Sequence, residues 1–294
     1  MRNLFSFILF SIILGCDTVA YKDARVTPTP ILAPKDTVDG INFEQKIFLE
    51  DYTGHTCGNC PGAATEVKKL MDQYGKRIVV MAIHAGNFAL PVLNPNKTSF
   101  KEDFRTSVGN DLDDKFKASD LGLPKGTVNR KKFTTGGSVS VLNYTEWGTR
   151  ISQIFAAQGN GVGIRIDPIL NTSTRVIDLK AKVIFKAAFS GKVNMMAYLV
   201  EDKIINWQKF YVPTTFDSAR YEHNYMLRAG LYPKNGDYAL SATIEFSADQ
   251  SIETDWQGTL PGNVVPENSK IIYVLTNGNT EEVIQVAEVN LISK

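Results

Sequence analysis

The chain has 294 residues, and 43% of them are hydrophobic, which is enough for a sizeable core and, after removal of a leader, for two domains. Its 32 basic and 31 acidic side chains give a net charge of +1. Because this balance creates no overall field that would attract a polyanion, the composition argues against a nucleic-acid-binding protein.

Residues 1–16 are typical of a processing signal. A single basic residue, Arg2, precedes an apolar run over residues 4–14, which is too short to span a bilayer. The run ends in the sequence Ile-Leu-Gly-Cys at residues 13–16, which resembles a bacterial lipobox. That resemblance implies cleavage before Cys16 and lipidation of this cysteine as the membrane anchor. The alternative is an ordinary signal peptide with a chance cysteine.

Residues 17–43 are polar, contain spaced prolines and show no apolar period. This composition predicts a flexible, extended tether of about 3 Å per residue. Acyl chains on Cys16 would hold the protein at a membrane surface without a spanning segment. An exported chain lies in an oxidising compartment, where an isolated pair of cysteines is either a structural disulfide or a redox couple.

Such a pair, Cys57 and Cys60, lies between a predicted strand and a predicted helix. Residues 46–52 are an apolar run typical of a buried strand. Apolar side chains within residues 63–74 recur at i, i+3, i+4 and i+7, which predicts a helix. In the run over residues 77–83, Arg77 is followed by six consecutive apolar residues, as in a central parallel strand. This order places the cysteines at the carboxyl end of the first strand, where open α/β sheets expose reactive groups.

A first domain is predicted over residues 44–158. A repeat of apolar side chains every four residues predicts helical structure over residues 100–112. The remaining predicted elements of this domain are strands over 127–133 and 139–142 and a helix over about 145–158.

The second predicted domain, residues 159–294, has a period of two instead. Apolar residues alternate with polar ones over 177–189, and Ser190-Gly191 is predicted to make a turn before a strand over 193–200. Asn277-Gly278 is a strong hairpin signal. Several strands without helical partners predict an antiparallel β-sandwich with a structural or recognition role.

The cysteine pair has the sequence form of a dithiol redox site. If the pair brackets the start of a helix, unpaired amide groups and the helix dipole favour an anion at Cys57. Cys57 is therefore the predicted nucleophile, because the thiolate is the attacking species in disulfide exchange. Cys60, about one turn into the helix, is the predicted resolving thiol.

The segment Phe48-Leu-Glu-Asp-Tyr-Thr-Gly-His-Thr-Cys-Gly-Asn-Cys resembles the active-site segment of the thioredoxin superfamily, and Leu123-Pro124 resembles its cis-proline loop. The resemblance implies that Asp51, six residues before the first cysteine, moves a proton to or from the resolving thiol. It also implies that Pro124 faces the disulfide and helps to bind the substrate backbone. Thr56, Asn59 and Lys125 depart from the usual tryptophan, proline and threonine of that family.

A narrower resemblance extends over nearly the whole chain. It is carried by the lipobox, the Tyr-Thr-Gly-His-Thr-Cys-Gly-Asn-Cys-Pro segment, Ile-His-Ala-Gly at 83–86, Leu-Pro before Asn129-Arg130, and His-Asn-Tyr-Met-Leu-Arg at 223–228. Together these segments resemble the outer membrane protein 28-related lipoproteins of Bacteroidetes-type bacteria. The resemblance implies an outer-membrane lipoprotein with a thioredoxin-like domain and a β-rich carboxyl-terminal domain. The absence of a dense acidic run after Cys16 favours a periplasm-facing orientation, with surface exposure as the alternative.

These inferences predict thiol-disulfide exchange with exported proteins, without a cofactor. Two alternatives have no redox step: a surface or binding lipoprotein that uses the fold as a scaffold, and a purely structural disulfide. A third alternative is a metal site formed by His55, Cys57, Cys60 and His84, although no second cysteine pair supports it. Otherwise His55 and His84 are predicted to flank the dithiol. His223 and Arg228 are predicted to hold a loop of the sandwich.

Overall fold

The structure is a computed structural model that describes residues 31–33, 41, 43–134, 138–157, 161–234 and 239–292. Cys16, the rest of the predicted signal segment and most of the predicted tether lie outside these ranges. Within them, no helix is both long and apolar enough to cross a membrane. Three residues of the predicted tether form a short strand, β1 (Ile31–Ala33), which pairs antiparallel with β12 (Gln250–Thr259).

A strand, a helix and a second strand form the centre of the amino-terminal part. These are β2 (Ile47–Thr53), α1 (Cys60–Tyr74) and β3 (Ile78–His84). β2 and β3 pair in parallel along their whole length, so Thr53 lies beside His84 at their carboxyl ends. The predicted strand-helix-strand order is therefore observed. α1 packs against both strands because its apolar face, including Val67 and Leu70, is buried with residues of these strands in one hydrophobic cluster.

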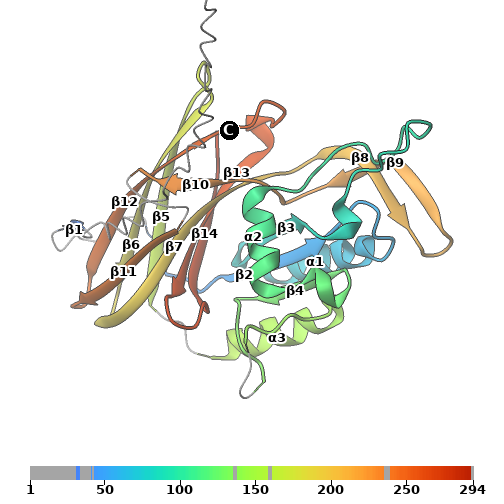
Figure 1. Ribbon diagram of the computed structural model, residues 1–294. Helices are drawn as coiled ribbons and strands as arrows, with labels where there is room; N and C mark the ends of the chain where they lie inside the picture. The colour runs from blue at the N-terminus through green and yellow to red at the C-terminus, as the bar shows by residue number, and fades with distance from the viewer. Residues whose placement is uncertain are drawn as a thin grey trace, which may run out of the picture.

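Further elements flank this unit (Figure 1). They are η1 (Gly75–Arg77), η2 (Asn87–Ala89), α2 (Ser107–Phe116), η3 (Ser119–Leu121), β4 (Lys125–Val128) and α3 (Tyr144–Ala156). β4 pairs antiparallel with β2. The helix predicted over 100–112 begins only at Ser107, where the Thr106 side chain accepts a hydrogen bond from the Gly109 amide and caps it. The predicted strand over 139–142 is reduced to a single bridge between Leu142 and Gly126.

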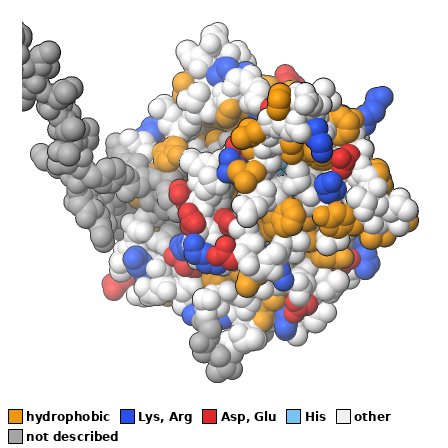
Figure 2. Space-filling view, turned by 45° about the vertical axis from the view of Figure 1, so that its right-hand side comes forward, with side chains coloured by type: hydrophobic (Ala, Val, Ile, Leu, Met, Phe, Trp, Pro, Cys, Tyr) orange, Lys and Arg blue, Asp and Glu red, His pale blue; other side chains and the backbone are white. Residues whose placement is uncertain are grey.

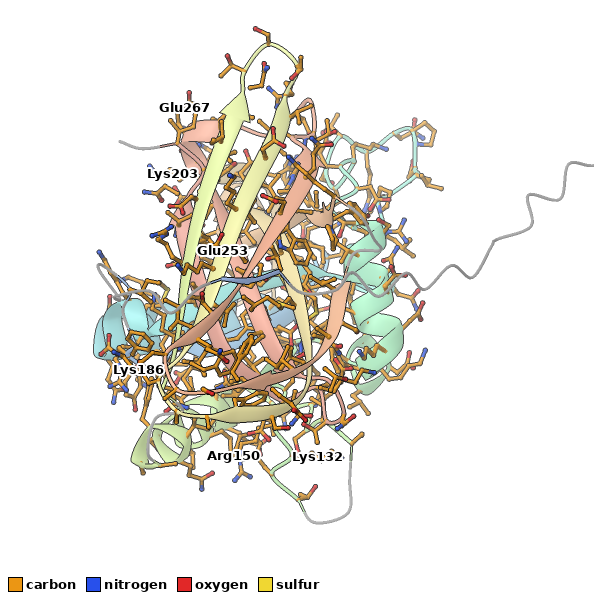
Figure 3. All side chains as sticks on the ribbon, turned by 90° about the vertical axis from the view of Figure 1, so that its left-hand side faces the viewer. Lys132, Arg150, Lys186, Lys203, Glu253 and Glu267 are labelled. Carbon is orange, nitrogen blue, oxygen red and sulfur yellow. A yellow bond between two sulfur atoms is a disulfide. The ribbon has the colours of Figure 1, made fainter. Side chains whose placement is uncertain are left out.

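The described residues of the carboxyl-terminal part form strands and one short helix. They are β5 (Val162–Asn171), β6 (Val176–Phe185), β7 (Phe189–Glu201), β8 (Ile204–Phe210), β9 (Phe216–His223), β10 (Met226–Pro233), β11 (Ala239–Phe246), β12, η4 (Pro266–Asn268), β13 (Ser269–Asn277) and β14 (Val283–Asn290). Figures 1 and 3 show the long strands arranged in two layers, and a hydrophobic cluster with residues of β5, β6 and β12 and of β7, β11 and β13 fills the space between them. On the outer side, Glu253 of β12 pairs with Lys182 of β6.

One detail of the predicted β-rich part is wrong. Ser190 and Gly191 do not form a turn, because both pair with β11 inside the continuous strand β7. The two parts of the chain also share one sheet. β10 pairs in parallel with β3 at Met226 and Ala82, and the Ala82 amide donates to the Tyr225 carbonyl at 2.8 Å. Strands from both sides of the predicted boundary at residue 158 therefore belong to one sheet.

The hairpin of β8 and β9, residues 204–223, is hereafter called the arm. Within the described residues, its two strands pair with no other strand and form a sheet of their own. Figure 1 shows that the arm leaves the two-layered part and extends to the end of α1 where the cysteines lie. Sequence periodicity did not predict it.

Candidate functional site

Cys57 and Cys60 form a disulfide with a Cα–Cα distance of 5.5 Å. Cys60 is the first residue of α1, and Cys57 lies in the loop that joins this helix to β2. The loop passes very close to its neighbours: a Cβ atom on Gly54 would lie 2.5 Å from the carbonyl of Phe88. The Thr56 amide donates to the same carbonyl at 3.1 Å. The predicted cysteine pair at the start of a helix is therefore present and fixed in place.

The arm covers this loop by backbone pairing. The Lys209 amide donates to the His55 carbonyl at 2.9 Å, and the Tyr211 amide donates to the Gly58 carbonyl at 3.0 Å. An extended strand thus lies against the loop in the manner of an added β-strand.

Side chains of the arm complete the cover. The Gln208 amide group donates to the Cys57 carbonyl at 2.9 Å. The ring of Tyr211 lies over Gly58 so closely that a Cβ there would be 2.4 Å from ring carbons. As a result Cys57 is only 2% exposed and Cys60 only 4%.

Apolar side chains remain exposed around this cover. They belong to the arm and to the loop that follows β3, and they are Ile205, Tyr211, Val212, Phe216, Phe88, Leu90 and Leu93. Figure 2, which brings the arm side of the molecule forward, shows hydrophobic side chains gathered on this face. An exposed patch of this kind is typical of a surface that binds another molecule.

A cavity of about 350 Å³ lies between α1 and the arm. Cys60 and Asp51 both line it. Asp51 projects from the carboxyl-terminal half of β2, is 5% exposed, and has no hydrogen-bond partner for Oδ1 within the described part of the chain. Burial raises the pKa of the Asp51 carboxyl from 3.8 to about 7. A carboxyl with this pKa is able both to give and to take a proton near neutral pH.

The three histidines of the chain lie together beside this cavity. The ring centroid of His84 is 6.3 Å from that of His55 and 5.6 Å from that of His223, and Phe104 packs against all three rings. His55 Nε2 donates to the Leu90 carbonyl at 3.1 Å. Neither ring nitrogen of His84 has a hydrogen-bond partner among the described residues.

Burial keeps the imidazoles of this cluster neutral. It lowers the pKa of His55 and lowers that of His84 further, and it brings the pKa of His223 to about 4. Within the described ranges, no group of three or more His, Cys, Asp or Glu side chains is arranged to hold a metal ion. Since both cysteine sulfurs are also bonded to each other, the geometry does not favour the four-ligand metal site.

Pro124 lies immediately before β4, and the Leu123–Pro124 peptide bond is cis. β4 places Gly126 opposite Asp51. Leu123 belongs to the same buried cluster as Cys57 and Cys60. The structure therefore brings the predicted residues Asp51, Cys57, Cys60 and Pro124 to one end of the β2, β3 and β4 strands.

The contribution of the arm to the site was not predicted from the sequence. His223 does not hold a loop within the sandwich as predicted; it is the last residue of β9 and lines the cavity with Tyr221 and Gln208. Arg228, by contrast, is structural, because its Nε lies 3.5 Å from Glu201 on the neighbouring strand β7. No local pattern marks the arm residues, since their partners lie about 150 positions earlier in the chain, as the hydrogen bond between Gln208 and Cys57 shows with a separation of 151.

Comparison with protein families finds a match to the family described as outer membrane protein Omp28 over residues 110–294, more than half of the chain. The chain belongs to the Omp28 family. Membership places it among outer membrane proteins. The Omp28 match begins after Cys57 and Cys60, so it does not bear on the chemistry of the disulfide.

The solved structures that are similar to this Omp28-family chain include two from one organism. HBP35 of Porphyromonas gingivalis has 16% identity and a TM-score of 0.59, over 85% of this chain and 76% of that one. At this identity the likeness shows the fold alone. A domain of the outer membrane lipoprotein Omp28 from the same organism has 19% identity and a TM-score of 0.28, over 45% of this chain and 88% of that one. No curated protein matches the chain.

Proposed function

We propose that the chain is a thioredoxin-like outer-membrane lipoprotein that exchanges disulfides with exported proteins through Cys57 and Cys60. The observation that carries the proposal is the disulfide at the start of α1 beside a buried carboxyl, Asp51, with a pKa near 7. The order of β2, α1, β3 and β4, with Pro124 immediately before β4, supports the thioredoxin-like assignment.

In the proposed reaction, Cys57 is the nucleophile and Cys60 the resolving thiol. Cys57 lies just before the amino-terminal end of α1, where amide groups and the helix dipole stabilise a thiolate. When Cys60 attacks the mixed disulfide, Asp51 takes its proton, since both groups line one cavity and the carboxyl titrates near neutral pH.

Because Cys57 is 2% exposed, a protein partner reaches its sulfur only after the arm moves away from the loop. Among the strands that the structure describes, those of the arm pair with none of the main sheets, so the arm is able to move without breaking them. Its exposed apolar side chains lie where such a partner would arrive.

The burial of both cysteines also supports a second candidate function, that of a binding lipoprotein in which the disulfide is only structural. In both cases Cys16 is the proposed lipid anchor, and the folded part faces the periplasm. Loss of the chain from the membrane fraction in Cys16→Ser would support the anchor.

Trapping of mixed disulfides tests the exchange directly. In cells, Cys60→Ser should accumulate disulfide-linked complexes with envelope proteins, because the resolving thiol is absent and Cys57 stays bonded to its partner. The matched variant Cys57→Ser should accumulate far fewer, and the double variant none. Equal, low yields from both single variants would favour the binding lipoprotein instead.

A further inference from the structure

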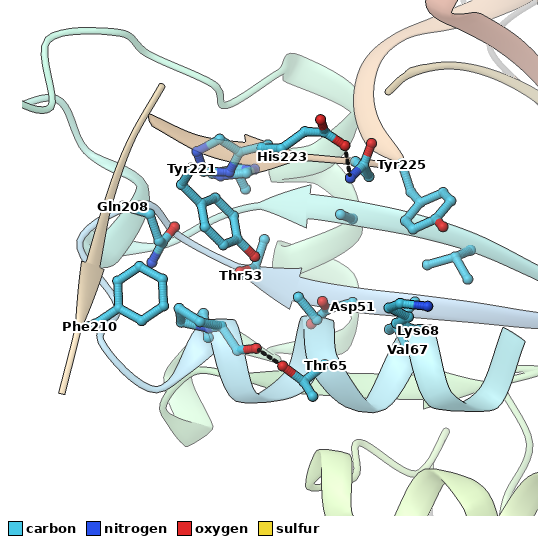
Figure 4. A pocket seen from close by; sticks show the side chains of 18 residues that line it. Asp51, Thr53, Thr65, Val67, Lys68, Gln208, Phe210, Tyr221, His223 and Tyr225 are labelled. Carbon is cyan, nitrogen blue, oxygen red and sulfur yellow. Dashed lines mark hydrogen bonds between the residues drawn. The ribbon is translucent and has the colours of Figure 1, made fainter. Parts of the chain in front are cut away.

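The two cysteines differ in their position relative to the cavity between α1 and the arm. Its wall includes Cys60 but not Cys57. Figure 4 shows Asp51 and Thr53 projecting from β2 at one side, with Tyr221 and His223 of the arm facing them. Cys57 instead lies under Gln208 and the paired backbone of the arm.

Two groups in the wall of this cavity lack partners. Oδ1 of Asp51 and both ring nitrogens of His84 make no hydrogen bond within the described part of the chain, although the two residues are only 5% and 4% exposed. Buried polar groups in native proteins are almost always hydrogen-bonded, to protein, water or ligand. The unpartnered groups of Asp51 and His84 therefore favour an occupant of the cavity that forms hydrogen bonds, such as water or a polar small molecule.

The volume of the cavity limits the size of the molecules that can enter it. A cavity of about 350 Å³ has room for roughly ten water molecules at about 30 Å³ each. A small organic molecule of similar size fits, whereas a folded protein does not. The polar groups Thr53, Tyr221 and Gln208 line the same space and offer further hydrogen bonds.

We propose that this cavity admits a low-molecular-weight thiol that attacks Sγ of Cys60 and so reduces the Cys57–Cys60 disulfide while the arm stays closed. This inference rests on the proposed function and names the class of its electron donor. The chain would then have two faces: protein substrates meet Cys57 under the arm, and the small thiol meets Cys60 through the cavity.

The step balances with two molecules of thiol. The first, as thiolate, bonds to Sγ of Cys60; the disulfide bond breaks, and its electron pair leaves on Cys57, whose thiolate the start of α1 stabilises. The second thiolate attacks the small-molecule sulfur of the mixed disulfide, and Cys60 leaves and takes a proton from the neutral carboxyl of Asp51. The two thiols are oxidised to one small disulfide, and the protons that they lost restore Asp51 and protonate Cys57.

Reduction kinetics of the purified protein test the inference, with cysteamine as the small thiol and a thiol carried on a dextran polymer as the large one. Cysteamine should reduce the disulfide of the native protein at least about tenfold faster per thiol, because access limits the large reagent. Ala64→Leu narrows the cavity with a good helix former and should slow the cysteamine reaction about tenfold. Ala156→Leu, on an exposed position of α3, is the matched control and should leave the rate unchanged.

A second variant keeps the test informative if Ala64→Leu has a folding defect. Thr65 is exposed and lines the same cavity, so Thr65→Leu should also slow the cysteamine reaction, as Ala64→Leu does. If neither variant slows it, and Tyr211→Ala speeds it instead, the thiol enters under the arm and the inference is wrong. Trapping by Cys60→Ser is scored separately, so absent complexes would count against the proposed function and unchanged cysteamine rates against the cavity route.

Discussion

Asp51 and His223 face one cavity, and burial shifts their pKa values in opposite directions. The pKa of Asp51 rises from 3.8 to about 7, and that of His223 falls from 6.5 to about 4. Both groups are therefore neutral in the folded protein between about pH 4 and pH 7. Their effects on the free energy of unfolding offset each other in that range, so single substitutions are needed to see them.

For Asp51, the unfolded chain ionises above about pH 3.8 while the folded chain keeps the proton up to about pH 7. Stability from the neutral carboxyl is thus fully present below pH 3.8 and lost as pH rises to 7. Relative to Asp51→Asn, the wild-type protein should lose about 4 kcal/mol of unfolding free energy between pH 4 and pH 8. Urea unfolding at both pH values measures this difference, and parallel profiles would contradict it.

For His223, the stability contribution depends on pH in the opposite direction. The folded pKa lies below the unfolded one, so stability is fully present above pH 6.5 and lost as pH falls through about 4. Relative to His223→Gln, the wild-type protein should lose about 3 kcal/mol on acidification over this range. The same urea titrations serve, and a difference of the same sign as that for Asp51 would refute the assignment.

Glu50 of β2, the strand that leads to the cysteines, forms a fully buried ion pair with Arg130. Arg130 donates to both Glu50 oxygens, at 2.6 and 2.9 Å, and Thr127 donates to one of them at 2.6 Å. Arg130 also contacts Tyr198 of β7 at 3.5 Å. The pair therefore ties β2 and β4 to the carboxyl-terminal strands.

Arg130→Met should destabilise the protein by about 3 to 5 kcal/mol, because it leaves the Glu50 carboxylate buried without its partner. Adding Glu50→Gln should recover part of this loss. Lys68→Met removes an exposed pair with Asp72 and should cost less than about 0.5 kcal/mol. Exposed ion pairs contribute at most about 1 kcal/mol. A loss of less than about 1 kcal/mol for Arg130→Met would therefore show that the buried pair is not important for stability.

The arm is the element on which access to Cys57 depends. A Cβ at residue 58 would lie 2.4 Å from the ring of Tyr211, too close for the present contact. In the reduced protein, Gly58→Ala should displace the ring and raise the rate at which a bulky maleimide modifies Cys57 several-fold. Gly148→Ala is the control, since a Cβ there meets only ordinary contacts at 3.5 Å. Equal rates in both variants would mean that the arm does not limit access.

Elements with a strong local period could be predicted from the sequence. β2, α1 and β3 follow from apolar runs and a helical repeat, and the cysteines, Asp51 and Pro124 come together because they flank these strands. The helix predicted from Phe100 starts later, since Phe100 itself has a positive φ of 59°. The arm has no comparable signal, because it is stabilised by contacts with distant residues.

At the scale of the whole molecule, the alternating pattern predicts a β-rich second part, and the strands that it contains are observed. Their pairing could not be predicted in the same way. β10 joins β3, and Gln285 of β14 donates to the carbonyls of Glu44 and Val162, across 241 and 123 residues. The contacts of Gln285 join the two parts of the chain, while the hydrogen bonds from Lys209 and Tyr211 attach the arm to the cysteine loop.

The reduction potential of the Cys57–Cys60 couple distinguishes an exchange catalyst from a structural disulfide. The purified protein would be equilibrated in glutathione or dithiothreitol buffers and its free thiols counted. The proposed exchange function requires a value between about −120 and −270 mV, the range of known exchange catalysts. A value well below about −300 mV would mean a stable structural bridge and would contradict the account.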